Sequence, residues 1–258
     1  RGAALVSFEF LAPDAAVSDD RFAPVARTPM ERDARAAGAR FELRDGWNVA
    51  VGYKSVEQER EAARRAAGWA DVSHLGKLEI HASADDLESI VGQVAGVSLE
   101  LGRAARANDA WWLPVTSDRA VVVCESAAVA ALRDRLEEAA AGASQTVSIV
   151  DATSKYAAMT IVGPLAREVF ARFTALDLRP AATPVHAFRP GSIARGPALL
   201  VREGEERYLF LFGWALGQYM WETVSDAGGH LGGSPIGLDA LEDVAIEDAP
   251  AREEAGRA

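Results

Sequence analysis

The stretch KLEIHASADDLESIVGQV, residues 77–94, combines two hydrophobic patterns in one short segment. Residues 77–82 have the pattern of a short β-strand, whereas the apolar residues of 84–94 recur at helical spacing. Ser83 stands immediately before the helical pattern, where a residue that caps a helix N-terminus is expected. The stretch therefore predicts a strand that leads directly into an amphipathic helix.

The same strand-then-helix pattern recurs along the chain. The further predicted pairs are strand 119–124 with helix 127–141, strand 157–162 with helix 165–173, and strand 207–212 with helix 214–227. Ser126 is the expected N-cap of the helix over 127–141, and Gly163-Pro164 precedes the helix over 165–173. Four such units, taken in two pairs, are typical of two linked modules of the split β-α-β kind.

Connecting strands are predicted over 110–116, 146–150 and 197–202. Together these elements predict an α+β fold of two linked split β-α-β (ferredoxin-like) modules around one continuous core. The helices are expected on one face of mainly antiparallel sheets. An earlier helix is predicted over 55–67, with a capping box formed by Ser55 and Gln58.

Composition limits the kinds of partner that this chain can bind. The 258 residues carry a net charge of −11, which argues against a nucleic-acid partner because such proteins need a cationic surface. No stretch approaches the ~20 apolar residues of a membrane span, and no secretory signal is apparent, so a cytoplasmic protein is expected. Cys124 is the sole cysteine, and the four histidines lack metal-motif spacing, so no metal site is predicted.

Residues 28–81 carry a series of short motifs in a fixed order. They are Thr28-Pro29, Gly38-Ala39, Gly46-Trp47, Tyr53, Glu59, Arg64, Gly68 and the run Asp71-Val72-Ser73-His74-Leu75-Gly76-Lys77. In these residues the chain resembles the folate-binding aminomethyltransferase family, whose members include the T-protein of glycine cleavage. So many matches in order over about fifty residues are more specific than any single short motif.

The later part of the chain matches this family more weakly, at Gly163-Pro164 and at Pro235-Ile236-Gly237-Leu238. The resemblance covers roughly 28–247, which is the expected folate-binding domain, with an N-terminal extension at 1–27 and a flexible tail at 248–258. The family's C-terminal barrel is expected to be absent. The chain's shortness and the segment around 207–228 are more similar to the small (gamma) subunit of sarcosine oxidase.

The chain departs from the family where ligand-gripping residues are expected. The family's acidic pair corresponds by its distance from Asp118-Arg119 to Asn108-Asp109, on a shortened loop. The carboxylate that grips the pterin ring in the family is replaced by Leu209. The family's Arg-Asp pair after Pro-x-Gly-Leu is Leu241-Glu242 here. The resemblance therefore implies an altered ligand pocket.

The resemblance implies a tetrahydrofolate pocket walled by residues 71–77 and 108–112. Asp109 is the expected catalytic carboxylate, although Asp is also common in a turn before a strand. The expected folate-binding residues are Asn108, Trp112, His74, Lys77, Tyr53 and Arg202. Within Asp71-Val72-Ser73-His74, turn and cap hydrogen bonds are favoured over a nucleophilic triad, since neighbouring residues rarely converge on one reacting atom.

Three functions fit these observations. The first is aminomethyl or methyl transfer from a small amine or methylated substrate to tetrahydrofolate. The second is a non-catalytic, gamma-like subunit of a heteromeric flavin amine oxidase of the sarcosine type. The chain has no glycine-rich dinucleotide motif, so any flavin is expected on a larger partner flavoprotein. The third is a folate-sensing or iron–sulfur-assembly accessory protein of the same superfamily.

Overall fold

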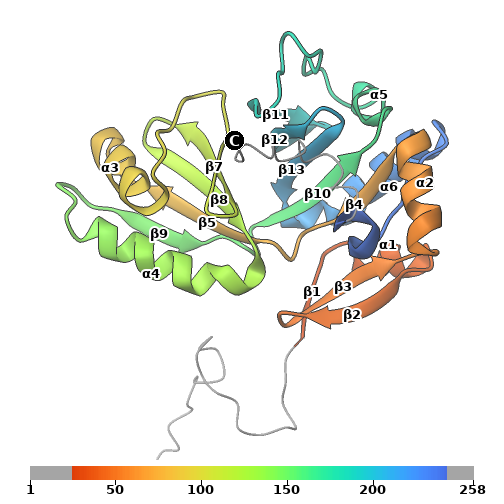
Figure 1. Ribbon diagram of the computed structural model, residues 1–258, viewed down its shortest axis with the longest axis horizontal. Coiled ribbons are helices and arrows are strands. Elements are labelled where there is room, and N and C mark those ends of the chain that lie inside the picture. Colours follow the sequence, from red (N-terminus) through yellow and green to blue (C-terminus); the bar gives the residue numbers. More distant parts are fainter. Residues whose placement is uncertain (1–24, 243–258) are drawn as a thin grey trace, which may run out of the picture.

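The computed structural model describes residues 25–242 (Figure 1). The expected tail at 248–258 and most of the expected extension at 1–27 lie outside the described residues. The last two residues of that extension, Ala26–Arg27, form strand β1, which pairs in parallel with β3 (Trp47–Gly52). Strand β1 therefore lies before the predicted domain boundary at residue 28.

The first module is a five-stranded antiparallel sheet covered by two helices (Figure 1). Its order is β6-β7-β8-β5-β9, so the strands of the split β-α-β unit lie in the order second, third, first, fourth. This is the arrangement that a ferredoxin-like unit requires. Its elements are β5 (Gly76–His81), α3 (Ala84–Ala95), β6 (Ala105–Ala107), β7 (Ala110–Thr116), β8 (Arg119–Cys124), α4 (Val129–Ala140) and β9 (Ser148–Asp151).

The second module is a six-stranded sheet in the order β11-β12-β13-β10-β4-β14. Strand β4 (Gly68–Asp71) precedes the first module in sequence, yet it lies between β10 and β14. The other elements are β10 (Tyr156–Val162), α5 (Ala166–Ala171), β11 (Phe188–Ile193), β12 (Gly196–Gly204), β13 (Arg207–Gly213), α6 (Gly217–Gly229) and β14 (Ser234–Pro235). An early segment of the chain thus completes a late sheet.

A small sheet of order β1-β3-β2 lies beside the second module (Figure 1). Strand β2 (Arg40–Arg44) turns into β3 through Asp45-Gly46, both of which have positive φ. Asp-Gly is typical of such a two-residue hairpin, because glycine adopts positive φ without steric cost. The helices of this region are α1 (Glu31–Ala36) and α2 (Val56–Arg65).

The helix boundaries show where capping was predicted well. Ser55 and Gln58 form the predicted capping box at the start of α2, and the Ser83 hydroxyl accepts from the Asp86 N–H at the start of α3. The prediction for Ser126 is wrong. It begins a short 3-10 turn, Ser126–Ala128, and its hydroxyl donates to the His74 carbonyl across the fold, while α4 starts at Val129.

Each sheet is covered by helices on one face, as the sequence predicted, but the core is divided into three clusters. One lies between the six-stranded sheet and helices α5 and α6, and another lies between the five-stranded sheet and helices α3 and α4. The third lies between the inner faces of the two sheets and includes Val49, Val51 and Ile236. The expectation of one continuous core is wrong, because successive strand residues point to opposite faces and both faces are buried.

Candidate functional site

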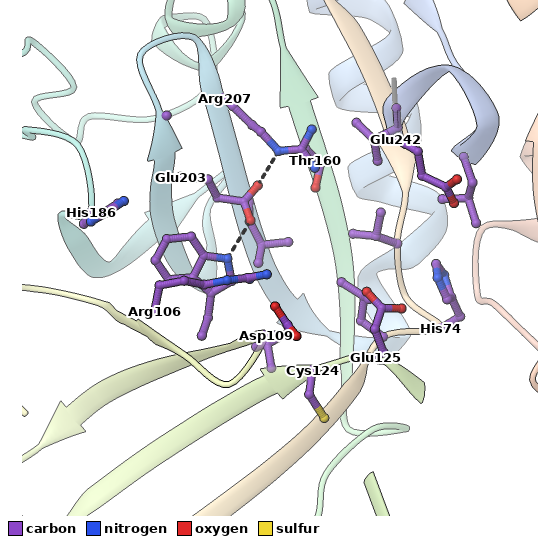
Figure 2. Close-up of a pocket in the computed structure, with 18 residues that line it drawn as sticks. His74, Arg106, Asp109, Cys124, Glu125, Thr160, His186, Glu203, Arg207 and Glu242 are labelled. Atoms are coloured by element: carbon purple, nitrogen blue, oxygen red, sulfur yellow. Dashed lines mark hydrogen bonds and ion pairs between the residues drawn. The ribbon is translucent and has the colours of Figure 1, made fainter. Parts of the chain in front are cut away.

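A pocket of about 570 Å³ opens between the inner faces of the two sheets (Figure 2). Thr160 and Leu209, which are register partners on β10 and β13, lie on the side of the second module. Trp111 and Val123, which are partners on β7 and β8, lie on the side of the first module. The pocket is therefore built jointly by the two modules. It also draws residues from 72–75 and 238–242.

The Trp111 indole is the aromatic wall of this pocket, and it is fixed by three neighbours. Its Nε1 donates to Glu203 Oε1 at 2.8 Å. The Arg106 guanidinium lies 5.2 Å from the ring centroid, and the His186 ring meets it edge-on at 5.3 Å. A wall held by a hydrogen bond and two ring contacts is preorganised, so it loses little freedom when a ligand binds.

Glu203 forms an ion pair with Arg207 across the β12–β13 hairpin, and both side chains line the pocket (Figure 2). Arg207 Nε donates to Glu203 Oε2 at 2.9 Å, and the two side chains are only 17% and 13% exposed. A register shift between Arg202 and Gly204 interrupts the strand pairing at Glu203. Arg207 Nη1 is buried without a hydrogen-bond partner among residues 25–242.

Asn108 and Asp109 form the two-residue turn between β6 and β7, where Ala107 pairs with Ala110. Their φ angles are 51° and 57°, as a turn with two left-handed residues requires. The Asn108 amide donates to the Val94 carbonyl at 3.1 Å, so it anchors the turn to the end of α3. Asp109 instead lines the pocket (Figure 2). Asn108-Asp109, which the sequence matched to the family's acidic pair, thus forms a hairpin turn.

Three carboxylates gather on one side of the pocket: Asp109, Glu125 and Glu242 (Figure 2). The pKa of the Glu125 carboxyl is raised, mainly because the pocket wall removes part of its solvent. The charge of Arg106 opposes this shift, whereas the charges of Asp45, Glu242 and Asp109 add to it. This side of the pocket therefore favours a proton or a cationic group.

His74 also lines the pocket and lies in the segment that joins β4 to β5. Burial, with the charges of Lys77 and Arg44, lowers the pKa of His74 to about 4, so the imidazole is neutral at pH 7. Its Nδ1 is buried and has no hydrogen-bond partner within the described part of the chain. A neutral histidine of this kind can accept or donate a hydrogen bond without carrying charge.

Ser73 and Asp71 make backbone hydrogen bonds instead of forming a triad with His74. Asp71 accepts from the Ser73 N–H at 2.9 Å, and the Ser73 hydroxyl bonds both the N–H and the carbonyl of Ala158. Ser73 is fully buried. These contacts fasten the β4–β5 segment to β10, which is the structural role that the sequence favoured.

The expected catalytic residue Asp109 and the expected folate-binding residues separate into two groups. Asp109 and His74 line the pocket, together with other members of segments 71–77 and 108–112. Asn108, Trp112, Lys77, Tyr53 and Arg202 do not line it. Trp112 is fully buried on the outer face of its sheet, against α3 and α4, because consecutive strand residues alternate in direction. The neighbouring Trp111 lines the pocket in place of Trp112.

The remaining three residues have structural partners. The buried Lys77 ammonium donates to the Ser73 carbonyl at 2.7 Å, and burial lowers its pKa to about 7. Tyr53 stacks on Trp221, with ring centroids 6.3 Å apart. Arg202 donates to the carbonyls of Thr183 and Glu205, at 2.8 Å each. Each of these three side chains thus stabilises the fold through contacts within the chain.

The sequence did not point to several residues that the pocket contains. Glu203 and Arg207 lie on either side of a hairpin turn, and nothing in the local pattern indicates the register shift that places Glu203. Glu125 follows β8 and precedes the turn at Ser126, a position that is usually solvent-exposed. Arg106 and Arg207 supply the cationic side chains of the pocket.

Two further features concern metals and membranes. Among residues 25–242, no group of three or more His, Cys, Asp or Glu side chains is placed to hold a metal ion. Within the same residues, no helix is long and apolar enough to cross a membrane.

Comparison with known families identifies the class of this protein. The family of the GCVT N-terminal domain matches residues 30–250, and the chain belongs to this family. The resemblance to the aminomethyltransferase superfamily that the sequence indicated is therefore confirmed, as is the α+β fold.

Individual relatives agree with this assignment. The aminomethyltransferase of Streptomyces avermitilis is 27% identical over 236 residues, which cover 85% of this chain and 62% of the relative. That of Mycobacterium tuberculosis strain H37Rv is 29% identical over 235 residues, covering 85% and 62%. The chain thus spans about 62% of the length of these relatives.

Solved structures show the same fold at low sequence identity. The glycine cleavage system aminomethyltransferase T from Bartonella henselae has a TM-score of 0.74 at 17% identity, over 88% of this chain and 63% of that one. A chain of the heterotetrameric sarcosine oxidase from Corynebacterium sp. U-96 has a TM-score of 0.62 at 20% identity. That match covers 80% of this chain and 96% of the sarcosine oxidase chain.

Proposed function

We propose that this protein binds tetrahydrofolate between its two sheets and transfers a one-carbon unit to it from a small amine or methylated donor. The observation that carries the proposal is a pocket that combines a fixed aromatic wall with polar groups of both charges, in a chain of the GCVT family. Its volume of about 570 Å³ is within the ~300–1,000 Å³ typical of small-molecule sites.

The residues of the pocket fit the chemical groups of tetrahydrofolate. Trp111 supplies an apolar face for the ring, beside the aliphatic Leu209 and Val123. Arg106 and Arg207 supply cations for oxygen atoms or for the carboxylates of the glutamate tail. Two buried polar atoms, Arg207 Nη1 and His74 Nδ1, have no partner among residues 25–242, so a polar ligand would satisfy them.

When bound, tetrahydrofolate supplies the nitrogen atoms that take up the one-carbon unit. The protein's own contribution is to orient the two reactants, exclude water and move a proton as the donor amine is released. Asp109 is the carboxylate that we assign to the proton. The neighbouring carboxylates of Glu125 and Glu242 favour a cationic amine on the same side of the pocket.

An assay of the isolated chain tests this function. Wild-type protein should transfer a one-carbon unit from at least one of a panel of N-methyl and aminomethyl donors to tetrahydrofolate. Loss of a general acid–base group costs about 10²–10⁴-fold in rate, so Asp109→Asn should reduce turnover by that factor while sparing folate affinity. Asp85→Asn, an exposed substitution on α3, is the control. Turnover that survives Asp109→Asn would remove the catalytic role from this residue.

A second function is favoured by one observation. The matching chain of heterotetrameric sarcosine oxidase is covered over 96% of its length, so its size is close to that of the described fold. Under this alternative the protein is a non-catalytic, gamma-like subunit that binds a larger flavoprotein. The isolated chain would then show no turnover with any donor, and it would form a stable heteromer when expressed with its partner.

A further inference from the structure

Glu203 is a partly buried carboxylate that faces the pocket and retains unused hydrogen-bonding capacity. Its two oxygens accept from different donors, Oε1 from the Trp111 indole and Oε2 from Arg207 Nε. A carboxylate has about four acceptor positions, so each oxygen can accept one further donor. The two oxygens can therefore receive a pair of adjacent N–H groups from a ligand in the pocket.

Its neighbours fix this carboxylate in place. The Arg207 guanidinium and the Trp111 indole each donate a hydrogen bond to one of its oxygens. The register shift between Arg202 and Gly204 falls at Glu203, whose side chain lines the pocket. By contrast, Asp109 and Glu125 are exposed.

Arg207 adds one hydrogen-bond donor beside the two acceptor oxygens of Glu203. Arg207 Nη1 lies on the same hairpin, is buried, and has no partner within residues 25–242. Two acceptors beside one donor complement a ring edge that presents an exocyclic amino group, a ring N–H and a carbonyl oxygen in sequence. The 2-amino-4-oxo edge of a reduced pterin has this order of groups, and Trp111 provides the wall beside it.

We propose that Glu203, positioned by Arg207 and Trp111, is the residue that recognises the amino and N–H edge of the ligand ring. This inference rests on the function proposed above, and it assigns the selectivity of the same pocket. The aliphatic Leu209, on the neighbouring strand, then serves as a packing surface for the ring and makes no hydrogen bond to it.

Titration calorimetry with two ligands tests this assignment. The ligands are tetrahydrofolate and its analogue with a 2-methyl group in place of the 2-amino group. Wild-type protein should bind the analogue about 10- to 100-fold more weakly, which is the range for a hydrogen bond to a charged group. Glu203→Gln should lose a similar factor for tetrahydrofolate and should bind both ligands about equally. Glu206→Gln, an exposed substitution on the same hairpin, should match wild type.

The outcomes separate this inference from the function on which it rests. Equal affinity of the wild-type protein for the two ligands, or an undiminished preference in Glu203→Gln, would overturn the assignment and leave folate binding in place. Absence of tetrahydrofolate binding by the wild-type protein would overturn both. Because the two-ligand comparison is made on wild type as well, it stays informative even if Glu203→Gln folds poorly.

Discussion

The two modules use the same split β-α-β plan but differ in how they are completed. The first module takes all the strands of its sheet from the contiguous segment 76–151. The second module needs β4, from residues 68–71, between β10 and β14. The difference shows that the first sheet is locally encoded. The second sheet forms only when distant parts of the chain come together, so its contacts cost more chain entropy.

The closure of the second module depends on a buried carboxylate and a glycine. Glu59 on α2 accepts from the backbone N–H groups of Tyr53, Lys54 and Gly237. Gly237 lies so close to the Val51 backbone that an added Cβ would stand 2.0 Å from its carbonyl carbon. These contacts join residues 51–59 to Gly237, which follows strand β14 closely in the chain.

The largest effect is expected from Gly237→Ala. The new methyl group would overlap the Val51 backbone, which cannot move as a flexible side chain does, so a loss of about 3 kcal/mol or more in the free energy of unfolding is expected. Denaturant unfolding measures it. Gly229→Ala, at the end of α6 with no atom within 4 Å of the added Cβ, is the control. Equal stability of the two variants would contradict this account of the closure.

A smaller effect is expected from pH, through His74 in the segment that links the two sheets. Its pKa is about 4 in the folded protein because burial disfavours the charged ring, against about 6.5 when unfolded. Between these values the unfolded chain binds more protons, so stability falls as pH decreases from 6.5 towards 4. The slope is at most about 1.4 kcal/mol per pH unit.

The test compares wild type with His74→Gln in urea unfolding at several pH values. The stability difference between them should change across pH 6.5 to 4 and be constant above pH 7.5. A difference that does not vary with pH would show that His74 is not buried in its neutral form.

The smallest effect is expected in the first module. Gly92 lies within α3, is exposed, and has open space where a Cβ would stand. Because glycine costs about 0.5–1 kcal/mol relative to alanine inside a helix, Gly92→Ala should stabilise the protein by about that amount. The melting temperature measures the change. A destabilised Gly92→Ala variant would show that α3 makes contacts at this position that the structure lacks.

The contrast between the modules also explains what the sequence could predict. Strand–helix pairs such as 77–94 gave correct elements, because periodicity and capping residues are local signals. The insertion of β4 beside β10 was not predictable, since Gly68–Asp71 is short and its partners on β10 are about ninety residues away in sequence. The small sheet of β1, β2 and β3 was missed as well, although Asp45-Gly46 is a hairpin signal.

The candidate site follows the same rule. Segment 71–77 and the turn at Asp109 were located from the sequence, because each adjoins a predicted strand or a motif. The choice between Trp111 and Trp112 depends on which sheet face is turned inward, and that depends on the second module. Glu203 and Arg207 meet through a register shift, which no sequence pattern of this chain indicates.

The central claim is that the pocket between the two sheets binds tetrahydrofolate, and calorimetric titration of the full chain tests it most directly. We expect wild-type protein to bind tetrahydrofolate with a micromolar dissociation constant. Trp111→Ala, which removes the aromatic wall, should weaken this binding about tenfold or more, because such a ring contact contributes roughly 1–3 kcal/mol. Tyr219→Ala, an exposed aromatic substitution on α6, should leave the affinity unchanged. No detectable binding at millimolar tetrahydrofolate, or equal affinity in Trp111→Ala and wild type, would contradict it.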